Sequence, residues 1–399
     1  MKEKIFGLIT AETDINKIII PNKILINSLS AKFKKIYILN LYNLKLFTKK
    51  KIKNNNLPTF IIEKNFQDYE EFKNFAKNKE IISLVFLGKD LTYFRIYYIL
   101  KKFNIKFIMV MYFSQIGNTQ TIDLNFKYLF KAYKLFFYKG FYKLFRILTI
   151  LNIFPKIDIL FESNSSVIKF VKNSRSRRLE RLIPQLNLSY FKEVIQINSI
   201  YFDRSKILKK SKIKKKKQII YIDTHINHFD REIREGKISK LEIDCFYNNL
   251  KIFLKKISDI YKKPIIISKH PKNNLNLIFY NTFKISKLTT DNEVANSEIV
   301  IFSLSSAILN AVLLKKKIIN VNSKYLGEYM SNINRQYVDA LGVISINIDK
   351  ELEINKKKFD YCLKNSIKNY ENYIKNKLNA DGVQMASKKI TKFIHKKYF

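Results

Sequence analysis

Residues 265–274 read IIISKHPKNN, an apolar run that ends in Lys269, His270 and Pro271. The run has the length and the β-branched content of a short buried strand. Proline biases the residue before it toward an extended backbone, so we expect His270 to be held at the carboxyl end of this strand. The chain contains only four histidines, and one of them occupies this position.

Apolar runs of the same kind recur along the chain and alternate with helical patterns. In the first half they fall at 4–10, 35–41, 81–88, 106–113, 157–163 and 193–199, with helical patterns that include 91–103 and 124–150. In the second half they fall at 218–223, 263–269, 283–288, 298–303 and 316–322. Near-continuous apolar strands that alternate with helices are typical of a parallel α/β sheet covered on both faces.

This alternation predicts two α/β lobes. At 399 residues the chain exceeds what one hydrophobic core normally supports. We expect an N-terminal Rossmann-like lobe over 1–203, a basic linker over 204–217, a C-terminal Rossmann-like lobe over 218–355 and helices over 356–399. Because open α/β sheets bind ligands at the carboxyl ends of their strands, the predicted fold class is two lobes that face a cleft.

The charge is strongly positive, with 75 Lys and Arg against 33 Asp and Glu and a net charge of +42. The chain is also rich in Lys, Ile, Asn, Phe and Tyr, a bias that AT-rich codons impose, so we do not expect a nucleic-acid partner.

The two cysteines of the chain, Cys245 and Cys362, give no disulfide framework. No stretch reaches the roughly 18 uncharged apolar residues of a membrane span, and we expect a cytoplasmic protein.

A second polar segment follows a strand at 298–317, EIVIFSLSSAILNAVLLKKK. Here Ser303, Ser305 and Ser306 form a turn between the strand and a helix, and Ser305 or Ser306 is the expected N-cap. A helix N-terminus presents free N–H groups to an anion such as phosphate. The sequence contains no GxGxxG or GxxxxGK[ST] pattern, which argues against dehydrogenases and P-loop enzymes.

The HP pair followed about 35 residues later by a Ser-Ser turn resembles the C-terminal domain of bacterial GT-B glycosyltransferases. The likeness is to the sialyltransferase, polysialyltransferase and capsule polysaccharide group, and by motif it covers residues 215–330. The resemblance implies a GT-B-like fold with an N-terminal acceptor lobe and a C-terminal nucleotide-donor lobe. It also implies donor-binding roles for His270, Ser305 and Ser306. Lys269, Pro271 and Ser303 adjoin them in the two segments, and we expect all six residues to bind the donor.

By the same resemblance, His270 contacts the donor phosphate and the serine turn holds the nucleotide of a CMP-sugar. The implied activity is metal-independent, inverting transfer from a nucleotide sugar to a surface polysaccharide or glycolipid, without a further cofactor. Glycerophosphotransferases that use CDP-glycerol carry a similar pair and remain an alternative. The acidic motif that supplies the base in the sialyltransferase group is missing; the ADG sequence at 380–382 lies in the C-terminal helical region.

Candidate bases come from two other segments. YIDTHINHFDREIREG, 221–236, begins at the end of a strand and places Asp223, His225, His228, Asp230 and Arg231 close together. We expect Asp223 to act as the general base, and His225, His228 and Arg231 to contact the acceptor or phosphate. A metal-dependent hydrolase that uses Asp223, His225, His228 and Asp230 is the alternative, as is a merely polar loop. Glu12 and Asp14, in TAETD at 10–14, are rival bases.

The segment 125–156 contains seven Lys and Arg residues, no acid, and many aromatic residues and leucines. Basic, aromatic-rich amphipathic helices lie on anionic membranes. The interpretation favoured here is a peripheral protein at the inner face of the cell membrane, which binds the anionic surface through this segment. The alternatives are a core helix pair with lysines in solvent, or a protein without enzymatic activity that binds membrane or nucleic acid by charge.

Overall fold

The computed structural model describes most of the chain and divides it into two compact units. The first contains residues 1–114, 134–200 and 379–399, and the second contains residues 115–133 and 201–378. The described residues are 2–46, 57–88, 91–111, 144–145, 147–163, 191–210, 216–224, 226, 235–270, 273, 278–350, 355–367, 369–376 and 384–399.

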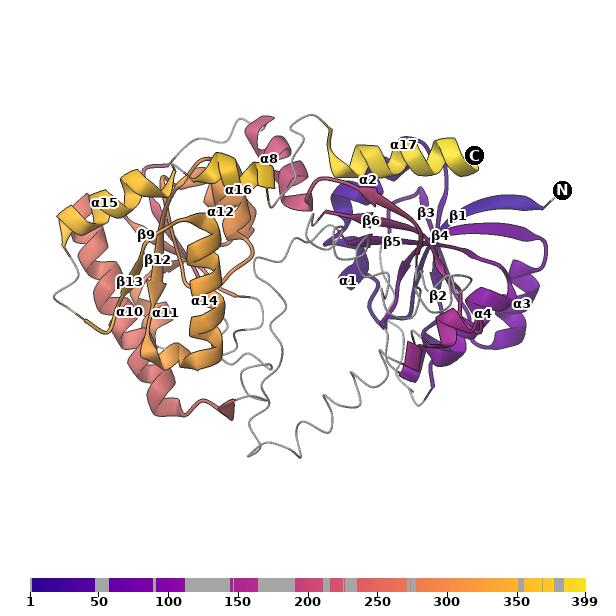
Figure 1. Cartoon of the computed structure of the whole chain (residues 1–399), viewed down its shortest axis with the longest axis horizontal. Helices are drawn as coiled ribbons and strands as arrows, with labels where there is room; N and C mark the ends of the chain where they lie inside the picture. The colour runs from indigo at the N-terminus through magenta and orange to yellow at the C-terminus, as the bar shows by residue number, and fades with distance from the viewer. Residues whose placement is uncertain are drawn as a thin grey trace, which may run out of the picture. The chain divides into compact units, whose positions relative to one another are not determined.

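The first unit is built on a parallel sheet whose described strands follow the order β3-β2-β1-β4-β5-β6-β7. The strands are β1 (Glu3–Thr10), β2 (Ile36–Asn40), β3 (Ile61–Asn65), β4 (Lys79–Phe86), β5 (Lys106–Met111), β6 (Ile157–Glu162) and β7 (Phe191–Gln196). The helices are α1 (Asn16–Ile19), α2 (Lys23–Ser30), α3 (Tyr69–Ala76), α4 (Phe94–Lys102) and α17 (Ala386–Tyr398), with 3-10 turns at Tyr42–Leu44 and Leu91–Tyr93. The C-terminal helix α17 lies beside α2 (Figure 1), and Thr391 Oγ1 is 3.0 Å from Ser28 Oγ.

The second unit holds a parallel sheet with the order β10-β9-β8-β11-β12-β13. Its strands are β8 (Ile219–Ile222), β9 (Ile265–Ser268), β10 (Lys284–Ile285), β11 (Ile299–Phe302), β12 (Lys317–Asn322) and β13 (Ser345–Asn347). Its helices are α8 (Ile200–Lys210), α10 (Lys240–Tyr261), α11 (Ile278–Thr282), α12 (Thr290–Asn296), α13 (Ile308–Leu313), α14 (Gly327–Leu341), α15 (Lys356–Ser366) and α16 (Tyr370–Asn376), with a 3-10 turn at Lys324–Leu326. The strand order reverses between β8 and β11, which is the position where doubly wound sheets bind ligands.

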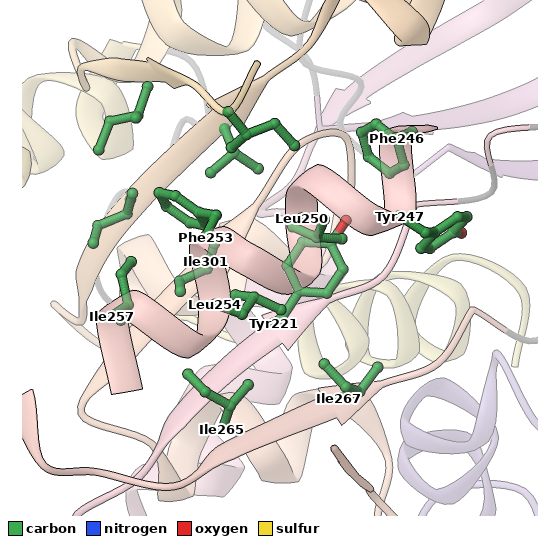
Figure 2. Packing of buried hydrophobic residues seen from close by; sticks show 14 of the residues in the cluster. Tyr221, Phe246, Tyr247, Leu250, Phe253, Leu254, Ile257, Ile265, Ile267 and Ile301 are labelled. Atoms are coloured by element: carbon green, nitrogen blue, oxygen red, sulfur yellow. The ribbon is translucent and has the colours of Figure 1, made fainter. Parts of the chain in front are cut away.

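Helix α10 shows how the sequence builds this core. Ser239 and Glu242 form a capping box that satisfies free N–H groups at its start. Apolar residues at a spacing of four and three form a row of side chains on the face that covers the sheet (Figure 2). These side chains pack against Ile265, Ile267 and Ile301. Fully buried residues of this row are Phe246, Leu250, Phe253 and Ile257.

The predicted parallel α/β class is confirmed, and each of the predicted apolar runs contains a strand. Two strands were missed. β3 is an edge strand with the polar sequence IIEKN, and β13 has three residues, so neither forms an apolar run. Residues 204–210, which were predicted as the first half of a linker over 204–217, are part of helix α8. The predicted C-terminal helices divide, since α15 and α16 belong to the second unit and α17 to the first.

Candidate functional site

Three segments meet at the carboxyl edge of the second sheet because β9, β8 and β11 are neighbours in it. Asp223 and Thr224 follow β8, Lys269 and His270 follow β9, and residues 303–306 follow β11. The sequence placed the HP pair and the serine turn at strand ends. The strand order brings them to the two sides of β8.

Asp223 is the buried centre of this edge, with 1% of its surface exposed. Its Oδ2 accepts hydrogen bonds from the Tyr280 hydroxyl at 2.8 Å, from Asn273 Nδ2 at 3.0 Å and from the backbone N–H of His270 at 3.3 Å. Its Oδ1 accepts one from the Tyr247 hydroxyl at 3.2 Å. Burial raises the pKa of Asp223, and these four hydrogen bonds act against the rise.

The tyrosines around Asp223 are held as hydrogen-bond donors. Burial raises the pKa of both Tyr247 and Tyr280, and the nearby Asp223 charge raises each pKa further. Asn273 Nδ2 lies 2.8 Å from the Tyr247 hydroxyl and 2.6 Å from the Tyr280 hydroxyl. The Lys269 ammonium lies 4.4 Å from the centre of the Tyr280 ring, within the range of a cation–π contact. The carboxylate, the two phenols and the lysine therefore form one connected cluster.

Thr224 joins this cluster to the serine turn. Its Oγ1 accepts a hydrogen bond from the backbone N–H of Leu304 at 3.2 Å and lies 3.4 Å from the Leu304 carbonyl oxygen, to which it can donate. Adjacent residues at the end of β8 thus contact both segments, Asp223 the HP side and Thr224 the serine side. The HP segment and the serine turn are therefore both in contact with the end of β8.

The serine turn differs from the prediction in one respect. Helix α13 begins at Ile308 with Ala307 as its N-cap, so neither Ser305 nor Ser306 caps the helix, and that prediction is wrong. The reason is a tight turn before the helix, in which the carbonyls of Ser305 and Ser306 accept N–H groups three residues later at 3.2 and 3.1 Å. Ser303 is buried, Ser305 is half-buried and Ser306 is exposed.

Ser306 is the exposed serine of this turn, yet its hydroxyl is fixed. Its Oγ accepts a hydrogen bond from the Tyr201 hydroxyl at 2.8 Å. Tyr201 lies on α8, and burial raises its pKa while the bond to Ser306 acts against the rise. Within the turn itself, Ser305 Oγ accepts the Ala307 N–H at 3.3 Å.

The rival acids lie in the first unit, just after β1. Glu12 has 32% of its side chain exposed and forms an ion pair with Lys17 at 3.6 Å. The carboxylate of Asp14 accepts the N–H of Asn16 at 3.1 Å and is partly exposed. Both acids are more accessible to solvent than Asp223. A further buried acid at a strand end, Glu162 as the last residue of β6, is 2% exposed and was missed.

Sequence reasoning also missed the partners of Asp223. Tyr247, Asn273 and Tyr280 come from α10, from the segment after the HP pair and from α11. Little in the sequence marks these residues: Tyr247 directly follows Phe246, and Asn273 lies two residues after Pro271. Several predicted site residues lie outside the described residues, namely Pro271, His225, His228, Asp230 and Arg231.

Within the part of the chain that the structure describes, no group of three or more His, Cys, Asp and Glu side chains is arranged to hold a metal ion. Three of the four ligands of the metal-dependent hydrolase hypothesis, at positions 225, 228 and 230, lie outside that part. Asp223 is the fourth, and its described partners are tyrosines, an asparagine and a backbone N–H.

Two Rossmann-like parallel sheets in one chain, with a helix from the C-terminus returning to the first, define a GT-B-like fold. Solved structures support this class. The wall teichoic acid polymerase TagF is similar, with a TM-score of 0.56 and 14% identity in one variant, over 99% of this chain and 88% of that chain. A TagF variant soaked with CDPG gives a TM-score of 0.56 and 13% identity over the same shares.

A UDP-GlcNAc 2-epimerase from Methanocaldococcus jannaschii is less similar, with a TM-score of 0.49 and 15% identity over 98% of this chain and 99% of that one. No protein-family model matches the chain. No curated protein matches it in sequence. The likeness to TagF, at this identity, establishes the fold alone.

Proposed function

We propose that the chain is a transferase that takes a group from a cytidine-nucleotide donor, a CMP-sugar or CDP-glycerol, and passes it to a hydroxyl of a cell-surface polymer or glycolipid. The observation that carries the proposal is the meeting of the HP segment and the serine turn at the point where the strand order of the second sheet reverses. That point is the usual ligand site of a doubly wound sheet.

The chemistry of the described residues supports phosphate binding there. Lys269 supplies a fixed positive charge beside Tyr280, and His270 supplies a half-buried imidazole at the end of β9. Positive and hydrogen-bonding groups stabilise the negative charge that develops on a leaving nucleotide phosphate. Ser305 and Ser306 supply hydroxyls at the end of β11 for the nucleotide. In this proposal His270 is the catalytic residue that contacts the phosphate.

Different observations support the two donors. The sequence motifs resemble those of enzymes that use CMP-sugars, whereas the TagF structures include one soaked with CDPG. Both donors contain cytidine and phosphate, so we propose that the site binds the cytidine nucleotide that they have in common.

Deprotonation of the acceptor hydroxyl requires a carboxylate that the acceptor can reach. Glu12 and Asp14 meet this condition better than Asp223, because both are partly exposed.

A thermal-shift screen of the purified chain with CMP, CDP, UDP and GDP tests the proposal. A ligand that binds only the folded state raises its stability, by about 2.7 kcal/mol at a concentration 100 times its Kd. We expect CMP and CDP to raise the unfolding temperature more than UDP and GDP do. Transfer assays with CDP-glycerol and a CMP-sugar then separate the two donors. Equal or absent shifts with all four nucleotides would contradict the proposal.

We also propose that the chain binds an anionic membrane surface, as the segment 125–156 predicts, through the part of that segment that belongs to the first unit. Residues 144–145 and 147–156 of this segment are described, and they are helical at 144–145 and 147–150. Leu144, Ile147 and Leu151 follow helical spacing and are 41%, 51% and 62% exposed, while Phe145 and Thr149 are buried. No helix among the described residues combines the length and the apolar character needed to cross a bilayer.

The neighbouring helix α4 extends this apolar surface. Its Phe94 and Tyr98 are 36% and 50% exposed, and the Phe94 ring lies 4.9 Å from that of Phe154. Arg95 and Lys102 are exposed on the same helix. We call Phe94, Tyr98, Leu144, Ile147, Leu151 and Ile153 the apolar patch. Apolar side chains next to cations match the chemistry of an anionic lipid surface.

A further inference from the structure

Asp223 lies at a strand end, where we expected a general base, but its contacts differ from those that a general base needs. A base must lie within hydrogen-bond reach of the hydroxyl that it deprotonates. Asp223 is 1% exposed, and both of its oxygens already accept hydrogen bonds from protein groups. An acceptor hydroxyl would have to displace Tyr247, Tyr280 or Asn273 to reach the carboxylate. The predicted role of Asp223 is therefore not favoured by its contacts.

We propose instead that Asp223 is a positioning residue, which fixes the backbone of His270 so that the imidazole is presented to the donor phosphate. This inference rests on the proposed function for the role of His270, but its structural part stands on contacts alone. The N–H of His270 donates to Asp223 Oδ2 at 3.3 Å, and the carbonyl of His270 accepts the N–H of Asn273 at 2.9 Å. Both backbone groups of His270 are thus engaged.

The same carboxylate also binds Asn273. Asn273 donates its side-chain amide to Asp223 Oδ2 at 3.0 Å, so the residues on both sides of the segment 271–272 are bound to one oxygen atom. Tyr280 and Tyr247 reach the carboxylate from α11 and α10, two elements that pack against the sheet. The backbone N–H of Asp223 donates to Ser268 at the end of β9 at 3.0 Å. Asp223 is the point at which four elements are joined.

Positioning and proton transfer make different demands on this side chain. A base needs a carboxylate, because it must bind a proton. A positioning acceptor needs only an oxygen at the place of Oδ2, which asparagine supplies with nearly the same shape. The amide nitrogen of asparagine would then face the Tyr247 hydroxyl, which can accept a hydrogen bond. Alanine supplies no acceptor and leaves the His270 N–H without its described partner.

The experiment compares Asp223→Asn, Asp223→Ala and Glu293→Ala. Glu293 is a matched control, since it is 6% exposed in the same unit and accepts from Gln218 at 2.8 Å and Ser286 at 2.6 Å instead of the HP segment. Backbone hydrogen exchange of peptides that cover residues 265–270 is measured by mass spectrometry, together with the Kd for CDP and the pH profile of transfer.

We expect Asp223→Ala to speed exchange at His270 and to weaken CDP binding by about tenfold or more, the loss of one good hydrogen bond. Asp223→Asn restores slow exchange and keeps the Kd for CDP within about threefold of wild type, a difference of less than one hydrogen bond. Its pH profile of transfer keeps the acidic limb, because another group is the base. Glu293→Ala lowers the unfolding temperature but leaves exchange at 265–270 as in wild type.

Two results would overturn the inference. Unchanged exchange at His270 in Asp223→Ala removes the positioning role. Loss of transfer in Asp223→Asn with an unchanged Kd for CDP makes Asp223 the base. If wild type binds no cytidine nucleotide, the proposed function fails while the exchange measurement still decides the positioning role. If Asp223→Ala does not fold, Asn273→Ala takes its place, and unchanged exchange at His270 in that variant also contradicts the inference.

Discussion

Replacement of Ile147 and Leu151 by glutamine should weaken binding to anionic membranes while leaving the fold intact. Both side chains belong to the apolar patch, and they are 51% and 62% exposed. Because they already contact water, the substitutions remove little packing, and we expect the free energy of unfolding to change by about 0.5 kcal/mol or less for each.

The expected loss of binding follows from these exposures. Full burial of an Ile or Leu side chain is worth about 1.5–3 kcal/mol. The two residues together expose roughly one whole side chain, so their transfer to the acyl boundary contributes about 2–3 kcal/mol. Such a loss weakens binding by about 30-fold to 150-fold. Lysines add about 1 kcal/mol each near an anionic leaflet, and salt screens this part.

Flotation with vesicles that contain phosphatidylserine, at low and at physiological salt, measures the effect. The matched control is Leu241→Gln with Ile252→Gln on α10, because these residues are 73% and 48% exposed in the second unit and outside the patch. Only the patch variant should lose flotation, and the loss should persist at low salt. If patch and control variants float equally well, the apolar patch is not the membrane surface. Failure of wild type to float at low salt would reject membrane binding altogether.

Three further outcomes are expected. His270→Ala should weaken CDP binding about 10-fold to 150-fold, the range of a charge-assisted hydrogen bond, with a folded protein by circular dichroism; normal binding and turnover would exclude His270 from the site. Glu12→Gln should lower kcat while the Kd for the nucleotide is kept, as measured by calorimetry, and full activity would leave Asp14 as the remaining exposed candidate. Burial raises the pKa of Asp223 above its ordinary value of 3.8, so the folded state binds this proton more tightly than the unfolded chain does. The free energy of unfolding of wild type should therefore fall relative to that of Asp223→Asn as pH rises from about 4 through the folded pKa. The fall is about 1.4 kcal/mol for each unit by which folding raises the pKa. Urea titrations across pH 4–8 measure it, and a constant difference in free energy of unfolding between the two proteins would contradict this sign.

Local patterns in the sequence were enough to predict the fold class and the strand ends at which His270 and the serines lie. Buried parallel strands such as β8, β9 and β11 are continuous apolar runs, because both faces of the sheet are covered and every position is inside. Helix α10 was predictable because one apolar stripe and a capping box at Ser239 are local features. The placement of His270 and the serines at strand ends followed from the same local patterns.

The contacts of these residues depend on how the elements pack in three dimensions. Tyr247 and Tyr280 lie 24 and 57 residues from Asp223 in the chain, and no periodicity indicates that their hydroxyls meet one carboxylate. The turn that moved the start of α13 to Ile308 and the return of α17 to the first unit were equally hidden. Local patterns fix which side chains are buried, because burial follows from the period of the element. The partners of a buried polar group depend on how distant elements pack, and for Asp223 that packing brings the side chains of Tyr247, Asn273 and Tyr280 to one buried carboxylate.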